Sequence, residues 1–293
     1  MDFARYWSTR QDRVERALDQ VLPPAETKPQ KIHDAMRYSI FAGGKRLRPI
    51  LCVAAAEVIS GEYENALPLA CSVEIIHTYS LIHDDLPCMD NDDFRRGKPT
   101  SHKVYGEGMA VLAGDALLTL AFEAAATCQA WPRYSHAVLI QELAKASGSQ
   151  GMVGGQVADV ESEGKKISVE DLQYIHLNKT AALITASIRL GGMAANAEPE
   201  QLESLTKFGR SLGLAFQVID DILDITQTTE QLGKSAGKDV AAQKATYPAI
   251  LGLDRAREIA DELTTQSRDA LKPFGEKARP LEMIADYLLD RKN

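Results

Sequence analysis

The stretch GLAFQVIDDILD, residues 213–224, carries an apolar helical pattern that ends in three carboxylates. Its apolar positions lack the strict alternation of a half-buried strand, so the stretch predicts a buried helix. Residues four apart lie on one face of an α-helix. Asp220 and Asp224 should therefore point the same way, with Gln217 one turn earlier and Asp221 at the flank. Carboxylates crowded on a buried helix repel each other and resist desolvation, so this pattern indicates a bound cation.

A second acidic cluster, DDLPCMD at residues 84–90, ends another apolar segment. Pro87 bends or ends a helix, which would let Asp84, Asp85 and Asp90 converge on one group of ions. Mg²⁺ takes oxygen ligands, usually a few carboxylates together with substrate phosphates. Either cluster alone is compatible with a solvated helix end. Two clusters behind apolar stretches indicate magnesium and a phosphate-bearing substrate.

The composition excludes several other classes of protein. The chain has 293 residues, 45% apolar and 25% charged, as in ordinary globular proteins. A formal charge of −8 without a basic stripe argues against nucleic acid as a partner. The four cysteines fit no zinc spacing and are typical of reduced packing residues, which favours a cytoplasmic location. The chain has no uninterrupted run of eighteen apolar residues, so we expect no membrane span.

Helical signals extend along the whole chain, and β-branched runs are short. No linker or shift in composition divides the sequence, so residues 1–293 are predicted to form one all-α domain. We expect helices at 3–21, 28–42, 46–60, 64–86, 108–128, 133–147, 150–162, 168–190, 198–225, 241–271 and 277–292. The two acidic helices are expected to face each other across a cavity, as in metal-binding helix bundles.

Cations accompany the acids. In the motif GGKRLRP at residues 43–49, Lys45 and Arg48 are three apart and are expected to share a helical face, whereas Arg46 points elsewhere and is interpreted as structural. Arginine and lysine are the usual ligands of phosphate groups. The other candidate cations are Arg95, Arg96, Lys179, Lys234 and Lys244. Two acidic poles with at least two groups of cations suggest two diphosphates, one held through metal and one held directly.

Together these motifs resemble the trans-isoprenyl diphosphate synthases over nearly the whole chain. The resemblance rests on GGKRLRP, both aspartate motifs in order, RRGKPT at residues 95–100, Lys179-Thr180 and Gly233-Lys234. It implies an all-α, isoprenoid synthase-type helical bundle around a central cavity, and a homodimer. It also implies isopentenyl diphosphate and allylic diphosphates as substrates, and about three Mg²⁺ ions.

The resemblance assigns a role to each candidate residue. Asp84, Asp85, Asp90, Asp220, Asp221 and Asp224 would hold the ions on the allylic diphosphate. The isopentenyl diphosphate site would consist of Lys45, Arg48, His77 and Arg96, and the allylic diphosphate site of Arg95, Lys179, Lys234 and Lys244. Thr180 and Gln217 would lie near the allylic carbon, where their oxygens stabilise a carbocation.

Product length is expected to depend on Tyr79 and Ser80, which precede Asp84 on the same helix. The growing tail points down this helix, and family farnesyl synthases carry an aromatic residue where this chain has Tyr79. We therefore expect a short-chain prenyltransferase that condenses isopentenyl diphosphate with dimethylallyl and geranyl diphosphate to make farnesyl diphosphate. The alternative is a geranylgeranyl diphosphate synthase, because the residues around Asp85 also resemble that group.

Two other functions fit the motifs less well. A terpene cyclase usually replaces the second aspartate motif and lacks the pair Lys45 and Arg48, which this chain has. A non-catalytic regulatory subunit of a prenyl synthase typically loses motif aspartates, and all six are present here.

Overall fold

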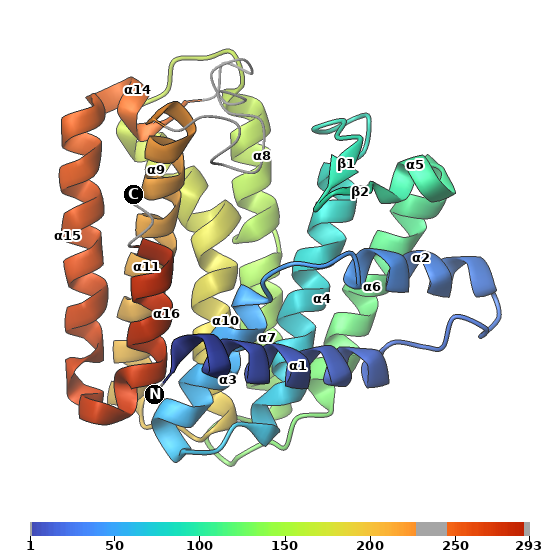
Figure 1. Cartoon of the computed structure of the whole chain (residues 1–293), viewed down its shortest axis with the longest axis horizontal. Helices are drawn as coiled ribbons and strands as arrows, with labels where there is room; N and C mark the ends of the chain where they lie inside the picture. Colours follow the sequence, from blue (N-terminus) through green and yellow to red (C-terminus); the bar gives the residue numbers. More distant parts are fainter. Residues whose placement is uncertain (1, 227–244, 290–293) are drawn as a thin grey trace.

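The computed structural model describes residues 2–226 and 245–289, and these form the all-α bundle expected from the sequence (Figure 1). The first half contains α1 (Phe3–Val21), α2 (Gln30–Ile40), α3 (Leu47–Ser60), the short η1 (Glu64–Ala66), α4 (Leu67–Asp84), α5 (Ser101–Tyr105), α6 (Glu107–Ala126) and α7 (His136–Ser147). The second half contains α8 (Met152–Ser162), α9 (Val169–His176), η2 (Leu177–Ala181), α10 (Ala182–Ala194), α11 (Pro199–Thr226), α14 (Tyr247–Leu251), α15 (Leu253–Leu271), η3 (Lys272–Ala278) and α16 (Arg279–Leu289).

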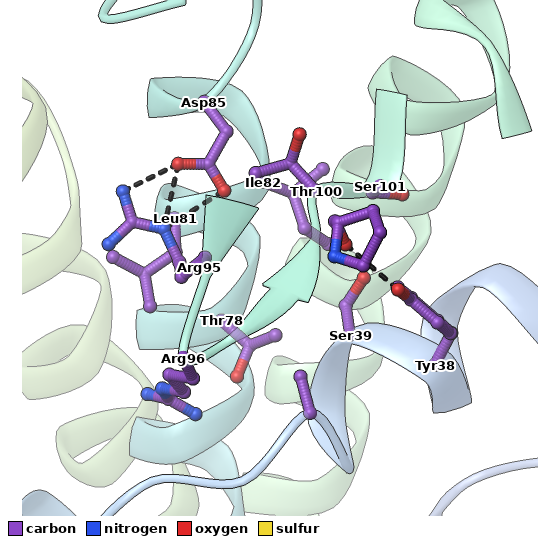
Figure 2. Close-up of a pocket in the computed structure, with 12 residues that line it drawn as sticks. Tyr38, Ser39, Thr78, Leu81, Ile82, Asp85, Arg95, Arg96, Thr100 and Ser101 are labelled. Atoms are coloured by element: carbon purple, nitrogen blue, oxygen red, sulfur yellow. Dashed lines mark hydrogen bonds and ion pairs between the residues drawn. The ribbon is translucent and has the colours of Figure 1, made fainter. Parts of the chain in front are cut away.

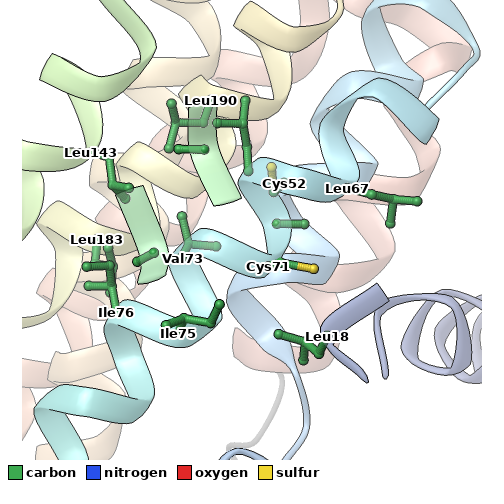
Figure 3. Packing of buried hydrophobic residues seen from close by; sticks show 14 of the residues in the cluster. Leu18, Cys52, Leu67, Cys71, Val73, Ile75, Ile76, Leu143, Leu183 and Leu190 are labelled. Atoms are coloured by element: carbon green, nitrogen blue, oxygen red, sulfur yellow. The ribbon is translucent and has the colours of Figure 1, made fainter. Parts of the chain in front are cut away.

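The two helices that end in the aspartate clusters, α4 and α11, pack into the apolar core. In the bundle α4 packs against α6 and α3, while α10 packs against both α3 and α11. The buried side of α4 includes Val73 and Ile76, which belong to the same apolar cluster as Leu183 and Leu190 of α10 (Figure 3). A second apolar cluster joins α11 to α15 and α16. Both acid-bearing helices are therefore anchored by apolar contacts on their other faces.

Three local features differ from the sequence-based expectation. Residues 94–99 form a small antiparallel hairpin, β1 (Phe94–Arg95) and β2 (Lys98–Pro99), in which Arg95 pairs with Lys98. Arg96 and Gly97 have φ of 54° and 75° and make a tight two-residue turn. The helix expected at 168–190 is continuous but contains a π-helical turn, η2. The helix expected at 241–271 is divided at Gly252, whose φ of 83° is outside the helical range.

Helix α6 is long and apolar enough to span a membrane, with a mean hydropathy of 1.6. This is weak evidence for a span, because packed helices of globular proteins have the same length and composition. In the most apolar eighteen-residue stretch of α6, 39% of the residues are buried, and the helix packs along α4.

Candidate active site

A cavity of about 500 Å³ lies between α4 and the pair formed by α8 and η2. Seven of the predicted site residues line it together: Arg48, His77, Tyr79, Ser80, Asp84, Lys179 and Thr180. Apolar side chains form the rest of its wall, including Leu86, Met152 and Val157. Residues separated by up to 132 positions in the sequence, Arg48 and Thr180 among them, thus line one cavity with a largely apolar wall.

The first acidic cluster lies at the end of α4. Asp84 is its last residue, and the turn after it returns so that the Asp90 amide donates to the Asp84 carbonyl at 2.8 Å. This turn brings the backbones of Asp84 and Asp90 together, while the convergence of their carboxylates on one group of ions stays a prediction. Burial raises the pKa of Asp84 to about 6, with Asp90 and Asp85 adding to the shift while Lys179 and Arg95 oppose it. A buried carboxylate with acidic neighbours is a group that a cation would stabilise.

Asp85 already has a partner. The Nε of Arg95 lies 2.7 Å from Oδ1 and 2.9 Å from Oδ2 of Asp85, so one guanidinium N–H faces both carboxylate oxygens (Figure 2). The hairpin β1–β2 holds Arg95 in this position, and Asp92 lies 3.6 Å from its Nη2. A smaller pocket of about 30 Å³ lies between these groups and α2. Asp85 and Arg95 therefore form an ion pair that lines this smaller pocket.

The second acidic cluster lies near the end of α11, where Asp220 precedes Asp224 by one turn as expected. Its carboxylates differ in the hydrogen-bond partners that they have. Asp221 Oδ2 accepts the backbone N–H of Tyr247 at 2.9 Å, and His176 Nε2 lies 3.9 Å away from the same oxygen. Asp224 is 3% exposed, and its Oδ2 is buried with no hydrogen-bond partner in the described part of the chain. A buried carboxylate oxygen without a donor is unfavourable unless a water or cation satisfies it.

The donor set fits Mg²⁺, which takes carboxylate oxygens. Its support is the raised pKa of Asp84 and the unsatisfied oxygen of Asp224. No group of three or more potential ligands is close enough to enclose an ion among residues 2–226 and 245–289. An ion here would therefore take further oxygens from substrate phosphates and water, as Mg²⁺ commonly does.

A cationic group lies beside the acids. Arg48 and His77 line the cavity, and the Arg96 guanidinium donates to the Gly43 carbonyl of the GGKRLRP turn. Burial lowers the pKa of Arg48 to about 10; Glu74 opposes this shift and Arg96 adds to it. Burial also lowers the pKa of His77 well below its usual range, and Arg48 and Arg96 contribute. Neighbouring arginines whose pKa values are lowered by burial and by other cations form a site suited to a polyanion.

The π-helical turn η2 carries Lys179 and Thr180. The Nζ of Lys179 donates to Asp159 Oδ2 of α8 at 2.6 Å, and the Thr180 hydroxyl donates to Gln217 Oε1 at 3.0 Å. This close packing depends on Gly155 of α8, because a Cβ at 155 would lie 2.1 Å from the Lys179 backbone nitrogen. Helix turns of the π type frequently occur at functional sites.

The expectation that Lys45 and Arg48 share a helical face is wrong. Arg46 has φ of 53°, so α3 begins only at Leu47 and Lys45 lies before the helix. The Lys45 ammonium lies 5.3 Å from the centre of the Tyr287 ring instead, and Lys45 does not line the described cavity. Lys234 and Lys244 lie outside the described residues.

Sequence reasoning missed three residues that support the site. Asp159 pairs with Lys179, Glu74 faces Arg48 and Arg96, and His176 lies against Asp221. A signal existed for Glu74, which is the single acidic residue inside the apolar segment 67–82. Asp159 and His176 lie among other polar residues, where sequence spacing does not distinguish them.

Comparison with known proteins agrees with this geometry. A heterodimeric geranylgeranyl pyrophosphate synthase large subunit from Arabidopsis thaliana is 52% identical over 299 residues, covering 100% of this chain and 80% of that protein. The structure of an FPP/GFPP synthase from Zymomonas mobilis has a TM-score of 0.84 at 37% identity and covers 98% of both chains. That of geranylgeranyl pyrophosphate synthetase from Pyrococcus horikoshii has a TM-score of 0.89 at 31% identity, covering 99% of this chain and 98% of that one. The family model described as polyprenyl synthetase matches residues 29–277, and the chain therefore belongs to the polyprenyl synthetase family, the trans-isoprenyl diphosphate synthases.

Proposed function

We propose that this protein is a short-chain prenyltransferase that condenses isopentenyl diphosphate with allylic diphosphates, and that its main product is geranylgeranyl diphosphate. The observation that carries the reaction is the cavity that combines Asp84, Lys179 and Arg48 with an apolar wall. The choice of product rests on relatives that match this chain over its whole length at about half identity. They include geranylgeranyl synthases from Arabidopsis thaliana and Catharanthus roseus. This product replaces farnesyl diphosphate as the favoured one.

The residues of the chain would divide the chemistry between them. The diphosphate of isopentenyl diphosphate would be held by Arg48, His77 and Arg96. The ammonium of Lys179 would turn from Asp159 toward the allylic diphosphate. When bound, Mg²⁺ would neutralise the leaving diphosphate and so favour ionisation of the allylic C–O bond.

The carbocation then needs protection from water and an electron-rich neighbour. The apolar wall excludes water, and Thr180 can turn oxygen lone pairs toward the allylic carbon because its hydrogen is used on Gln217. The double bond of isopentenyl diphosphate attacks this carbon, a new C–C bond forms, and the proton lost from the condensed product passes to the released diphosphate.

Farnesyl diphosphate is the second candidate product, and Tyr79 favours it. Tyr79 is 6% exposed and lines the cavity five residues before Asp84, where a bulky side chain shortens the space for the tail. Burial raises the Tyr79 pKa to about 12, with Asp84 adding to it, so the side chain is a neutral phenol.

The test is product analysis after incubation with Mg²⁺, isopentenyl diphosphate and dimethylallyl, geranyl or farnesyl diphosphate. A twenty-carbon product supports the proposal, whereas an end at fifteen carbons returns farnesyl diphosphate to first place. If no starter is elongated, the catalytic proposal fails and the regulatory-subunit alternative replaces it. Asp84→Ala should abolish turnover while the circular dichroism spectrum stays unchanged; wild-type activity in this variant would contradict the metal role of Asp84.

We also propose a homodimer that uses the outer face of α6. Leu112 of this helix is 53% exposed, although the helix is apolar over most of its length. Light scattering of the purified protein should give twice the monomer mass, and Leu112→Glu should reduce it. A cytoplasmic location and the absence of a nucleic-acid partner remain predictions; the relatives from Arabidopsis thaliana and Catharanthus roseus are named chloroplastic.

A further inference from the structure

His83 precedes the metal-binding motif but does not point with it. Its imidazole extends from α4 to α6, where Nε2 lies 3.1 Å from the Val111 carbonyl oxygen. A carbonyl only accepts hydrogen bonds, so Nε2 must carry the proton and the ring is held in one tautomer. Asp115 Oδ1 is 4.0 Å from the same nitrogen, at the outer edge of ion-pair range. His83 thus ties the two helices together beside the cavity that both help to line.

Gly114 of α6 makes room for this ring. A Cβ placed on Gly114 would lie 2.1 Å from His83 Nε2 and 2.5 Å from its Cδ2. Real Cβ contacts are never this short, so any side chain at 114 must push the imidazole out of its notch. A Cβ placed on Gly108 of the same helix would have no other atom within 4 Å, so the close approach is specific to Gly114.

The other face of His83 supports Tyr79. The two ring centroids are 5.7 Å apart with an interplanar angle of 79°, an edge-to-face arrangement between residues one helical turn apart. Such pairs are favourable beyond the area they bury. Tyr79, His83 and Val111 all line the cavity, so the chain Val111–His83–Tyr79 forms a continuous part of its wall.

We propose that His83, seated in the Gly114 notch, is a positioning residue that fixes the Tyr79 ring and so sets how far the prenyl tail extends. This inference rests on the proposed prenyltransferase function and adds a residue pair that acts through Tyr79. The His83 imidazole is held by α6, and His83 is not among the residues assigned to either diphosphate. Its loss should therefore change which product accumulates rather than the chemistry of condensation.

Two substitutions should move the product in opposite directions. His83→Ala removes the support and opens space beside Tyr79, so the ratio of the longest product to the one five carbons shorter should rise about fivefold or more, equivalent to about 1 kcal/mol. Gly114→Ala forces the imidazole toward the cavity, so the same ratio should fall by a similar factor. Gly108→Ala is the matched control, with the same added methyl on the same helix, and should leave the ratio unchanged.

The ratio is internal to each reaction, so a loss of total activity or of folded protein does not change it. If both His83→Ala and Gly114→Ala give the wild-type ratio, the proposal is overturned. If His83→Ala does not fold, Gly114→Ala against Gly108→Ala decides alone. Calorimetry with geranyl, farnesyl and geranylgeranyl S-thiolodiphosphates measures binding without turnover. If the wild-type protein binds these analogues but elongates no substrate, the proposed function is contradicted. The order of the three affinities in the variants still tests the role of His83 in that case.

Discussion

Replacing Arg46 by Met should remove a large part of the stability of the fold. The Arg46 side chain is fully buried, and its Nη1 lies 2.8 Å from Glu74 Oε1. Its Nε lies 2.6 Å from Glu15 Oε1, and its Nη2 donates to the Ile40 carbonyl at 2.6 Å. Glu74 is also buried, with 2% of its side chain exposed, whereas Glu15 is 31% exposed and can turn to solvent.

The size of the effect follows from the charge left behind. Removing one partner of a buried ion pair costs about 3–5 kcal/mol, because the other charge stays buried without compensation. Replacing both partners by apolar residues is often nearly neutral. Arg46→Met should therefore lower the free energy of unfolding by about 3–5 kcal/mol, and the double variant Arg46→Met, Glu74→Met should recover at least half of this loss. Because Glu74 also faces Arg48 and Arg96, the double variant should still bind isopentenyl diphosphate differently from wild type.

Urea unfolding followed by circular dichroism measures each free energy, and Arg255→Met is the control. Arg255 makes exposed pairs with Glu258 and Glu262, so its loss should not shift the midpoint measurably. The reasoning is refuted if Arg46→Met costs less than about 1 kcal/mol, the range of surface ion pairs. It is also refuted if the double variant is no more stable than Arg46→Met alone.

Three further predictions concern the site. Burial lowers the pKa of His176 to about 4, with Asp159 and Asp220 opposing the shift and Lys179 adding to it. The folded state therefore loses stability as the pH falls from about 6.5 to 4, by about 3 kcal/mol at about 1.4 kcal/mol per pH unit. In His176→Leu, the free energy of unfolding measured in urea should depend less on pH in this window. An unchanged pH dependence contradicts the assignment. Gly155→Ala should push α8 away from η2 and lower turnover at least about tenfold, since a misplacement of about 1 Å can cost a hundredfold; wild-type kinetics would show that the contact tolerates a methyl group. Asp221→Asn keeps an acceptor for the Tyr247 amide and should leave the Mg²⁺ concentration for half-maximal activity nearly unchanged. Asp84→Asn should raise this Mg²⁺ concentration at least about tenfold. Equal effects of the two variants would mean that Asp221 is a ligand too.

The sequence was sufficient for the fold class, which depends on local patterns, while the roles of the site residues stay predictions. The apolar runs that end at Asp84 and at Asp224 predicted two buried helices, and the structure has α4 and α11 there. The break at Pro87 predicted that Asp84 and Asp90 would meet, and their backbones are hydrogen-bonded. These outcomes follow from helical periodicity and proline geometry alone.

Long-range partners were not predictable in the same way. The wrong placement of Lys45 came from Arg46, a non-glycine residue in the left-handed region that no local pattern required. Its conformation is maintained by Glu15 and Glu74, 31 and 28 residues away. The hairpin that holds Arg95 was also missed, since two-residue strands lack a measurable alternation.

The two aspartate motifs look alike in sequence, yet the structure separates their members by the partners they already have. The Asp85 carboxylate accepts a hydrogen bond from Arg95, and the Asp221 carboxylate accepts one from the backbone N–H of Tyr247. Both carboxylates therefore already have a donor from the protein. Burial raises the pKa of both Asp84 and Asp85, but in Asp85 the hydrogen bond from Arg95 opposes the shift. Asp224 keeps a buried oxygen without a donor in the described part of the chain. A cation gains most where a carboxylate is least compensated, because only there does its binding remove an existing cost. We therefore expect Asp84 and Asp224 to respond to Mg²⁺ more strongly than Asp85 and Asp221, and the engaged members of each motif to orient the loop and the helix that carry the others.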